Sequence, residues 1–433
     1  MIIVRDYIVF LWRAWRLSFS GSPAYYAWMA LLTILAVIGG NAYMRQLVEG
    51  MATTGMTDKV SWGAYIANFT FFVGVAAASV MVVIPAYVYR FKPMREVVLF
   101  GELLAVAAML TSLLFVVVDL GRPDRFWHMM PLIGKFNFPE SMLAWDVITL
   151  TGFLLLNLHI CGYLLYVKYR GQDATRLFYI PFVFISIIWA ISVLTVEAFL
   201  YAGLVGRPFW NSAIVAPRFL MSAFVSGPAI IILALQVIRR VTEYTVKDEA
   251  IHLLRKIMTV SLLVNMFLLA AEMFTEFYSG SLHNAGARYL FFGLEHNGHT
   301  SNMLVPWIWS AIAMEMVAVV ILLTAAGRRI SLLNIACVAS VIGIWIEKGM
   351  GLLIPGFVPT PLGDVQEYLP SVNETLVCVG IWAVGALVYS WSLHLAVPIL
   401  TGRFRKGDGG VVDSDTHIRG AEGYGAVGAE GKS

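Results

Sequence analysis

The sequence predicts an all-α protein that crosses a membrane with about ten helices. Two observations predict this class. Hydrophobic residues make up 59% of the chain and charged residues only 13%, about half the charged fraction of a typical soluble domain. The apolar residues also gather in runs of about 20 or more, long enough to cross roughly 30 Å of hydrocarbon as α-helices.

The apolar runs define a membrane domain over residues 24–400 of the 433. The predicted spans are 24–44, 64–89, 97–118, 144–167, 177–203, 213–238, 256–278, 304–326, 330–347 and 373–399. Spans two to five (64–203) and six to nine (213–347) could form two four-helix bundles of the same orientation, with spans one and ten as flanking helices.

The two ends of the chain lie outside these spans. Residues 1–23 mix arginine and tryptophan with short apolar stretches and lack the cleavage site of a signal peptide. We therefore expect an interfacial helix at the membrane surface. Residues 401–433 are rich in glycine and poor in apolar residues, which predicts a flexible or partner-ordered tail.

Lysine and arginine are shared unequally between the two sides of the predicted membrane domain. The N-terminal segment, the even-numbered loops and the tail hold about two thirds of the 30 basic residues. Because basic residues near span ends favour the cytoplasmic side, we expect an inner-membrane protein with both termini in the cytoplasm. The basic residues are scattered between spans, so the net charge of +3 does not indicate nucleic-acid binding.

Ionisable residues within the spans concentrate toward the predicted outer side. Since charged groups are costly inside a bilayer, each is a candidate functional group. The set comprises Asp119, Asp146, Glu197, Tyr201, Arg218, Glu272, Glu276, Glu347 and Glu374, with Asn265 two turns below Glu272. Some of these residues could equally reach water at a helix end, notably Asp119, Glu347 and Glu374, and others could form polar contacts between helices.

The predicted inner half of the membrane domain is poorer in such groups. It contains Glu102, His159 and His394, with Glu315 near the midplane. A b-type haem needs histidines at matched depth on facing helices, whereas these two histidines lie at different depths. The three cysteines form no CxxC pair, and "HNGH" at 296–299 is first of all a turn signal. We therefore expect no haem, iron–sulphur cluster or metal ion bound by this chain.

Four segments carry a resemblance to a known family. They are "DLGRPDRFWHM" after span three, "GRPFWNSAIVAPRFLMSAFVSG" before span six, "LLAAEMFTEFYSG" in span seven and "EKGMGLLIPGFVPTPLGDVQEYLPSVNETL" before span ten. Over nearly its whole length the chain resembles the NrfD-like family, the membrane subunits of polysulphide and nitrite reductase systems. Within that family it is most similar to the DsrP subunits of the sulphite-reduction-associated DsrMKJOP complex and their Hme counterparts.

The resemblance implies a helix bundle without haem that binds menaquinone near the outer face, in the first bundle. It also implies a ferredoxin-like partner subunit that carries [4Fe–4S] clusters. In the DsrP-like case, the further partners would be a b-type cytochrome membrane subunit, a multihaem c-type cytochrome and a cytoplasmic iron–sulphur subunit. The chain would then be part of a multisubunit oxidoreductase and would not act alone.

The main hypothesis is therefore a quinone-reactive membrane subunit of an electron-transfer complex. Quinol oxidation releases electrons to a partner and protons to nearby side chains. The candidates for catalytic proton handling are Asp119, Asp146, Glu197 and Tyr201. The candidates for quinone binding are Tyr65, Asn68, Arg122, His128 and Trp145. A proton path could use His159, Arg218, Asn265, Glu272 and Glu276.

Two functions of other classes stay open at this point. A proton-coupled secondary transporter would use the same buried acids, and such proteins often contain broken helices near the midplane. The Gly227-Pro228 pair in span six is one possible break, although no matching break is evident. The chain could also be a purely structural membrane anchor for redox partners.

Overall fold

The computed structural model describes residues 2–130, 133–278, 284–296 and 298–406. It confirms an all-α, multi-pass membrane protein, because ten helices among these residues are long and apolar enough to cross a membrane. The described strands are β1 (Leu294–His296) and β2 (His299–Ser301), a small antiparallel hairpin. Most of the predicted tail lies outside the described residues, which end at 406.

Seven spans are single α-helices: α2 (Pro23–Glu49), α5 (Lys92–Asp119), α6 (Met142–Tyr169), α8 (Val215–Val241), α9 (Asp248–Tyr278), α11 (Val305–Leu323) and α14 (Val372–Leu400). An eighth, α7 (Ile180–Ala202), follows a 3-10 turn at Arg176–Phe178. The short elements outside the spans are α1 (Ile2–Leu17), α10 (Ala285–Phe291) and 3-10 turns at Met51–Thr53, Pro123–Met129, Pro208–Trp210 and Ala325–Arg328.

The two remaining spans contain π-helical turns. Span two consists of α3 (Ala64–Ala77), α4 (Val80–Val83) and a π-helical turn at Ile84–Val88. Span nine consists of α12 (Ile330–Ile344), a π-helical turn at Trp345–Met350, α13 (Gly351–Leu353) and a 3-10 turn at Ile354–Gly356. The structure thus continues span nine to Gly356, past its expected end at residue 347. Such π-helical turns occur frequently at functional sites.

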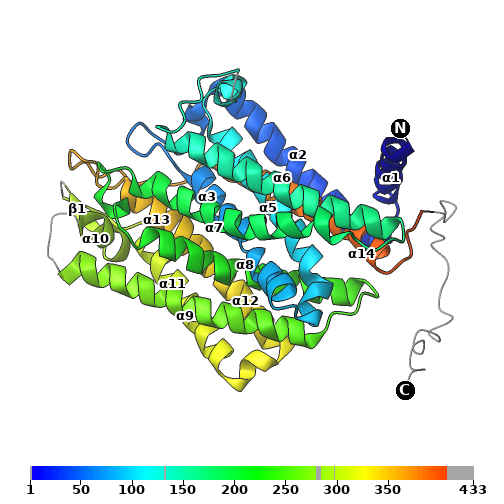
Figure 1. Cartoon of the computed structure of the whole chain (residues 1–433). Helices are drawn as coiled ribbons and strands as arrows, with labels where there is room; N and C mark the ends of the chain where they lie inside the picture. The colour runs from blue at the N-terminus through cyan, green and yellow to red at the C-terminus, as the bar shows by residue number, and fades with distance from the viewer. Residues whose placement is uncertain (1, 131–132, 279–283, 297, 407–433) are drawn as a thin grey trace.

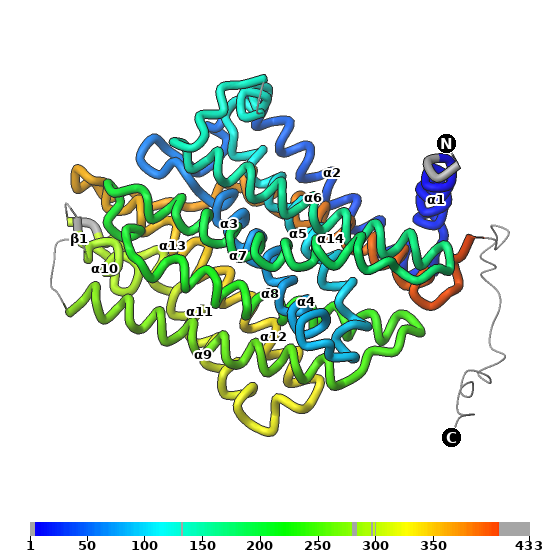
Figure 2. The backbone as a smooth tube through the Cα atoms, in the orientation of Figure 1, coloured from blue at the N-terminus to red at the C-terminus, as the bar shows by residue number. Residues whose placement is uncertain are grey.

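α3 is buried deep in the helix packing, and Figure 2 traces its backbone among the other spans. In span two, 72% of the most apolar window is buried inside the protein, against 17% for α2 at the periphery. α3 packs against α5 and α7 on one side, and against α8 and the π-helical turn of span nine on the other. It therefore joins the two groups of helices, whose division into two four-helix bundles stays a prediction.

Both termini of the described chain lie at the same end of the bundle (Figure 1). We call this the terminal end, defined by α1 and the last turn of α14, and the opposite end, which carries α10 and the β1–β2 hairpin, the far end. Lys406 holds α1 there, with its ammonium 2.6 Å from the carboxylate of Asp6. That ammonium lowers the pKa of Asp6 below its ordinary value. Whether the terminal end is cytoplasmic stays a prediction.

Two glycines allow α2 to pack closely against α14. A Cβ placed on Gly39 would overlap the backbone of Gly380, whereas one placed on the neighbouring Gly40 would meet no atom within 4 Å. The close approach of the two helix backbones therefore requires glycine at position 39. It does not require glycine at position 40.

We expect Gly39→Ala to destabilise the protein and Gly40→Ala to leave it as stable or slightly more stable. Overpacking costs about 1–3 kcal/mol, whereas alanine is favoured over glycine in a helix interior by about 0.5–1 kcal/mol. Thermal unfolding of both variants in the same detergent measures the difference. Equal stability of the two variants would contradict this packing.

Candidate functional site

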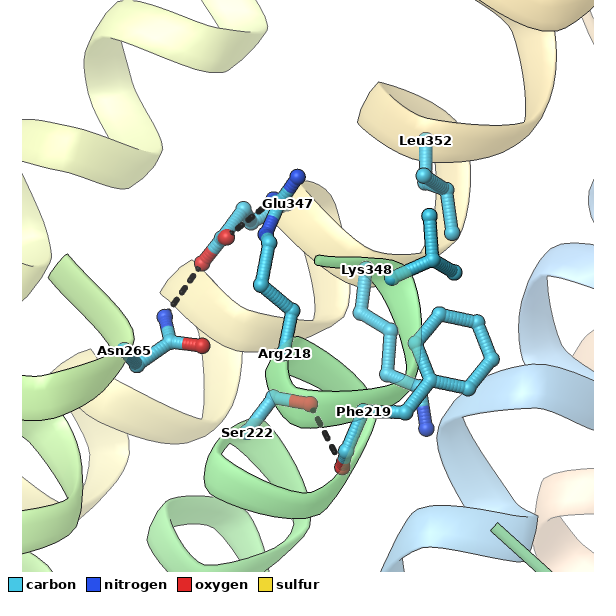
Figure 3. A pocket seen from close by; sticks show the side chains of 8 residues that line it. Arg218, Phe219, Ser222, Asn265, Glu347, Lys348 and Leu352 are labelled. Carbon is cyan, nitrogen blue, oxygen red and sulfur yellow. Dashed lines mark hydrogen bonds and ion pairs between the residues drawn. The ribbon is translucent and has the colours of Figure 1, made fainter. Parts of the chain in front are cut away.

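A buried cationic side chain links three helices in the half of the bundle formed by α8, α9 and span nine. Arg218 on α8 forms ion pairs with Glu272 on α9 and with Glu347 in the π-helical turn; the second pair joins Nη2 and Oε1 at 2.5 Å. Asn265 on α9 donates from Nδ2 to Oε2 of Glu347 at 2.8 Å. All four residues are at most 8% exposed. Figure 3 shows Asn265, Glu347 and Arg218 converging on one point.

A third buried carboxyl group adds to this cluster. Glu315 on α11 is 1% exposed and interacts electrostatically with both Glu347 and Arg218. It packs against Gly343, where a Cβ would lie 2.8 Å from the Cγ of Glu315. Three carboxyl groups thus surround one guanidinium. A small cavity of about 10 Å³ borders Arg218, Asn265 and Glu347, about the space that one water molecule needs.

The residue after Glu347 points toward the other half of the protein. Lys348 is 4% exposed, and its Nζ lies 3.6 Å from Oε2 of Glu197 on α7. The same ammonium lies 4.2 Å from the centre of the Phe219 ring, at a distance that allows a cation–π interaction. In Figure 3 the side chains of Glu347 and Lys348 run in different directions, one toward Arg218 and the other past Phe219.

The backbone of span nine explains how adjacent residues serve two networks. Neighbouring residues on any helical turn project in different directions, so a single buried turn can face α8 and α9 with one side chain and α7 with the next. α3 comes close to this turn because Gly74 faces the ammonium: a Cβ there would lie 3.0 Å from Nζ of Lys348. The space for the lysine head group thus depends on that glycine.

Three of the four catalytic candidates lie together near Lys348. Glu197 and Tyr201 on α7 are both 0% exposed, and Asp146 on α6 is 3% exposed. Glu197 interacts electrostatically with Asp146, and the hydroxyl of Tyr201 is hydrogen-bonded to that of Thr70 on α3 at 2.5 Å. Both oxygens of the Glu197 carboxylate and Oδ1 of Asp146 are buried without a hydrogen-bond partner in the described chain.

The fourth catalytic candidate, Asp119, is the last residue of α5. Its Oδ1 is buried without a hydrogen-bond partner in the part of the chain that the structure describes. It interacts electrostatically with Tyr65 and Tyr201. Asp119 therefore borders the group formed by Asp146, Glu197 and Tyr201, and among the described residues no hydrogen bond or ion pair joins it to them.

Two of the quinone-binding candidates are buried and already hydrogen-bonded within the chain. The hydroxyl of Tyr65 donates to Oε1 of Gln46 at 2.6 Å. Oδ1 of Asn68 accepts from the indole N–H groups of Trp345 at 2.9 Å and Trp382 at 2.8 Å, while its amide donates to the backbone of Ala64. In this structure both polar groups join helices and are occupied by protein partners.

The other three binding candidates are exposed: Arg122 and His128 lie in the segment between α5 and α6, and Trp145 lies in the first turn of α6. Arg122 forms an exposed ion pair with Asp124 at 3.2 Å, and its guanidinium holds the pKa of Asp124 below the ordinary value. The His128 ring stacks on Trp127, and the indole of Trp145 donates to the backbone of Pro139 at 2.8 Å. The structure therefore does not bring these three side chains together with Tyr65 and Asn68.

The proton-path candidates divide in the same way. Arg218, Asn265 and Glu272 belong to the buried cluster, and Glu276 lies one turn farther along α9, partly buried. His159 instead lies on an exposed face of α6, where its Nε2 is 3.0 Å from the carbonyl oxygen of Phe178. It contacts none of the buried carboxyl groups.

Sequence reasoning missed Lys348 and left Glu347 open as a helix-end residue. Both side chains lie inside the bundle because span nine continues to Gly356. The signal that could have found them is the apolar segment "GMGLLIP", which directly follows the two charges. If this segment is taken as a continuation of the span, Glu347 and Lys348 lie about two turns inside the helix.

Metal binding finds no support among the described residues. No group of three or more histidine, cysteine, aspartate or glutamate side chains there is arranged to hold a metal ion. The buried acids are arranged around Arg218 and Lys348 instead.

Comparison with known proteins assigns the chain to a family. The polysulphide reductase NrfD family matches residues 52–359, a segment that includes every member of the buried charge cluster. The chain belongs to the NrfD family. The resemblance of the four sequence segments is thereby confirmed at the level of the family, whereas a particular closeness to the DsrP subunits stays a prediction.

Similar proteins occur in archaea and bacteria. The chain is 24% identical to a putative dimethyl sulfoxide reductase membrane subunit of Halobacterium salinarum, over 83% of this chain and 88% of that protein. It is 23% identical to an Hdr-like menaquinol oxidoreductase integral membrane subunit of Archaeoglobus fulgidus, over 85% and 92%. It is also 23% identical to a menaquinone reductase integral membrane subunit of Nitratidesulfovibrio vulgaris, over 84% and 90%.

We expect Arg218→Met to destabilise the protein strongly, because it leaves Glu272 and Glu347 buried without a cation. Breaking a buried ion pair on one side costs about 3–5 kcal/mol. Adding Glu347→Gln should restore part of the loss, since the second substitution removes an uncompensated charge. The measurement is a double-mutant cycle of unfolding in mixed micelles.

The control for this cycle is Arg45→Met, which breaks an exposed pair with Glu49 whose side chains are 62% and 50% accessible. Exposed pairs contribute little to stability, so this variant should unfold like the wild type. Additive effects of Arg218→Met and Glu347→Gln would show that the two side chains are not coupled.

Proposed function

We propose that this chain is a menaquinone- or menaquinol-reactive membrane subunit of a respiratory electron-transfer complex. Its membership of the NrfD family supports this, as do relatives named as a menaquinol oxidoreductase subunit and a menaquinone reductase subunit. Electrons would pass to or from [4Fe–4S] clusters of a ferredoxin-like partner subunit at the far end of the bundle. This places the reaction in an oxidoreductase complex and not in the chain alone.

One observation carries the proposal: buried carboxyl oxygens without hydrogen-bond partners in the described chain lie beside a buried lysine. Glu197 and Asp146 offer acceptor oxygens in a water-poor interior, and Lys348 lies 3.6 Å from Glu197. These groups fit the hydroxyls of a quinol ring, which need acceptors for their protons. A bound quinol supplies two electrons and two protons when it is oxidised. Glu197 and Asp146 accept the protons. Lys348 stabilises the Glu197 carboxylate until that carboxylate accepts its proton.

An apolar cleft of about 340 Å³ lies one helical turn from Glu197 along α7. It lies between α7, α8 and α9, and its α7 wall includes Leu194, one helical turn from the glutamate. Apolar walls such as Leu220 and Leu268 suit an isoprenoid chain, because ligand sites are usually apolar pockets with few polar groups. In this proposal the cleft receives the tail, while the ring oxygens face the Glu197 carboxyl group.

In this proposal, a proton released from Glu197 passes on to the carboxyl groups around Arg218. Within the described chain, the five carboxyl groups of Asp146, Glu197, Glu272, Glu315 and Glu347 share two buried cations, Arg218 and Lys348. Unpaired buried charge is costly, so protons occupy part of this set and can be exchanged along it. Proton translocation and a link to dissimilatory sulphur metabolism belong to the same proposal.

The partner set follows from the DsrP-like resemblance. Besides the ferredoxin-like subunit, the complex would contain a b-type cytochrome membrane subunit, a multihaem c-type cytochrome and a cytoplasmic iron–sulphur subunit. The exposed side chains of Arg122, His128 and Trp145 suit contact with a partner better than contact with a quinone, because they lie at the surface of the helix bundle.

The transporter alternative loses its main sequence argument. α8 runs continuously from Val215 to Val241 with Pro228 inside it, so the Gly227-Pro228 pair does not break the helix. The anchor alternative would use the same ion pairs only to hold helices together. Kinetics of the assembled complex separate both alternatives from the proposal.

We expect Glu197→Gln to lower quinol oxidation by the assembled complex by about 10²-fold or more, the usual contribution of a general base. Asp119→Asn should have a smaller effect, since Asp119 only borders the group. Glu49→Gln at the exposed end of α2 serves as the control. Rates are measured with a menaquinol analogue and an artificial acceptor for the partner's clusters.

Wild-type-like oxidation by the Glu197→Gln complex would remove Glu197 from the proposed role. Wild-type-like oxidation by Lys348→Met as well would leave only the anchor function. Solute uptake into vesicles by the isolated chain would favour the transporter.

A further inference from the structure

A second site lies at the terminal end of the bundle, far from the acids of the proposed quinone site. A cleft of about 490 Å³ separates the first turns of α9 from the end of α11 and the 3-10 turn at Ala325–Arg328. Its lining combines three basic side chains with hydroxyl and apolar groups: Arg255, Lys256, Arg328, Thr259, Val260 and Leu323.

The basic residues of this cleft have no acidic partners among the described residues. Within the described chain, none of Arg255, Lys256 and Arg328 forms an ion pair, and Nε of Arg255 is buried without a hydrogen-bond partner. The guanidinium of Arg255 makes a long hydrogen bond instead, 3.4 Å from Nη1 to the carbonyl oxygen of Leu322. Three cations therefore face one cleft with their charge uncompensated.

Some other basic residues at the same end have acidic partners. Arg239 pairs with Asp248 at 2.7 Å, Lys247 pairs with Glu96 at 2.6 Å, and Arg403 pairs with Glu243. A general excess of basic residues near span ends explains the composition of this end. It does not by itself explain why three cations without an ion pair in the described chain line one cleft between two membrane helices.

The walls of the cleft indicate the kind of anion that would bind. Val260 is 62% exposed and Leu323 is 60% exposed, and both lie on membrane-spanning helices, so their surface faces acyl chains. We propose that the cleft binds an anionic phospholipid, with its phosphate between Arg255, Lys256 and Arg328 and one acyl chain along Val260 and Leu323. Basic pockets between membrane helices bind anionic head groups in this way.

A neighbouring cleft is less suited to the anionic head group. On the other side of Lys256, an apolar cleft of about 740 Å³ lies between α9 and the π-helical turn of span two. Glu249 lines that cleft together with His252, so its polar end carries an acid that repels a phosphate. The anionic head group therefore belongs on the Arg255 and Arg328 side of Lys256.

The test uses the full-length chain, purified in detergent and stripped of lipid, with lipid binding followed by native mass spectrometry. The probes are phosphatidylglycerol and phosphatidylcholine with identical acyl chains. The wild type should bind phosphatidylglycerol more tightly. Arg255→Gln/Lys256→Gln/Arg328→Gln should abolish this preference, and Lys256→Gln alone should reduce it by about fivefold, the effect of one basic residue near an anionic lipid.

The matched control removes three basic residues of the same end that have acidic partners: Arg239→Gln/Lys247→Gln/Arg403→Gln. This variant should keep the wild-type preference. Equal loss in both triple variants would mean that only the overall charge of this end matters, and no preference in the wild type would mean that the site is absent; either result overturns the proposal. If the cleft variant fails to fold, Lys256→Gln, whose side chain is exposed, still allows the comparison.

A competition arm separates the two sources of a phosphate group. Millimolar inorganic phosphate should leave bound phosphatidylglycerol in place, because free phosphate lacks the acyl chain contact with Val260 and Leu323. Complete displacement by inorganic phosphate would assign the cleft to a soluble anion and overturn the lipid assignment. This inference does not depend on the quinone reaction, and its failure would leave the proposed function untouched.

Discussion

The ion pairs of Arg218 with Glu272 and Glu347 set the arrangement on which the rest of the structure depends. A guanidinium can be buried among membrane helices only where carboxylates and hydrogen-bond acceptors surround it. α8, α9 and span nine are therefore fixed in one relative register. Apolar residues of similar volume would hold three helices together at least as well. Under the proposed function, these buried charges also serve proton exchange.

The π-helical turn Trp345–Met350 carries this constraint into the other half of the protein. Its first residue, Trp345, is held by Asn68 on α3, which also binds Trp382 on α14. Two residues later, Glu347 pairs with Arg218, and Lys348 then reaches Glu197. One turn thus connects α3, α7, α8 and α14. A change of charge at Glu197 alters the ion pair with Lys348 directly. The adjacent residue of the same turn, Glu347, pairs with Arg218 in the other cluster.

Apart from the end of span nine, the sequence was sufficient for the number and positions of the spans, because the length of an apolar run and the thickness of a bilayer are both nearly fixed. The sequence was also sufficient to predict that Asp146, Glu197 and Tyr201 lie at a similar depth. It could not predict the rotation of each helix, which decides whether Asn68 faces a ligand or the two tryptophans. Lys348 was missed for a related reason: a charge in the sequence was taken as the end of a helix, whereas the chain buries it by pairing it with Glu197.

The depth of the charged groups bears on the direction in which protons would leave. Among the described residues, Asp146, Glu197 and Lys348 form one group and Arg218, Glu272 and Glu347 form a second, and the two are linked through the adjacent residues Glu347 and Lys348. Toward the terminal end, the buried carboxyl group of Glu102 stands apart, with both oxygens lacking a hydrogen-bond partner in the described chain. A proton taken up at Glu197 therefore meets exchangeable groups toward α9 before it meets any toward the terminal end. Under the proposed function, a transfer across the whole membrane would require water between Glu197 and Glu102, whereas release at the far end would use the carboxyl groups around Arg218.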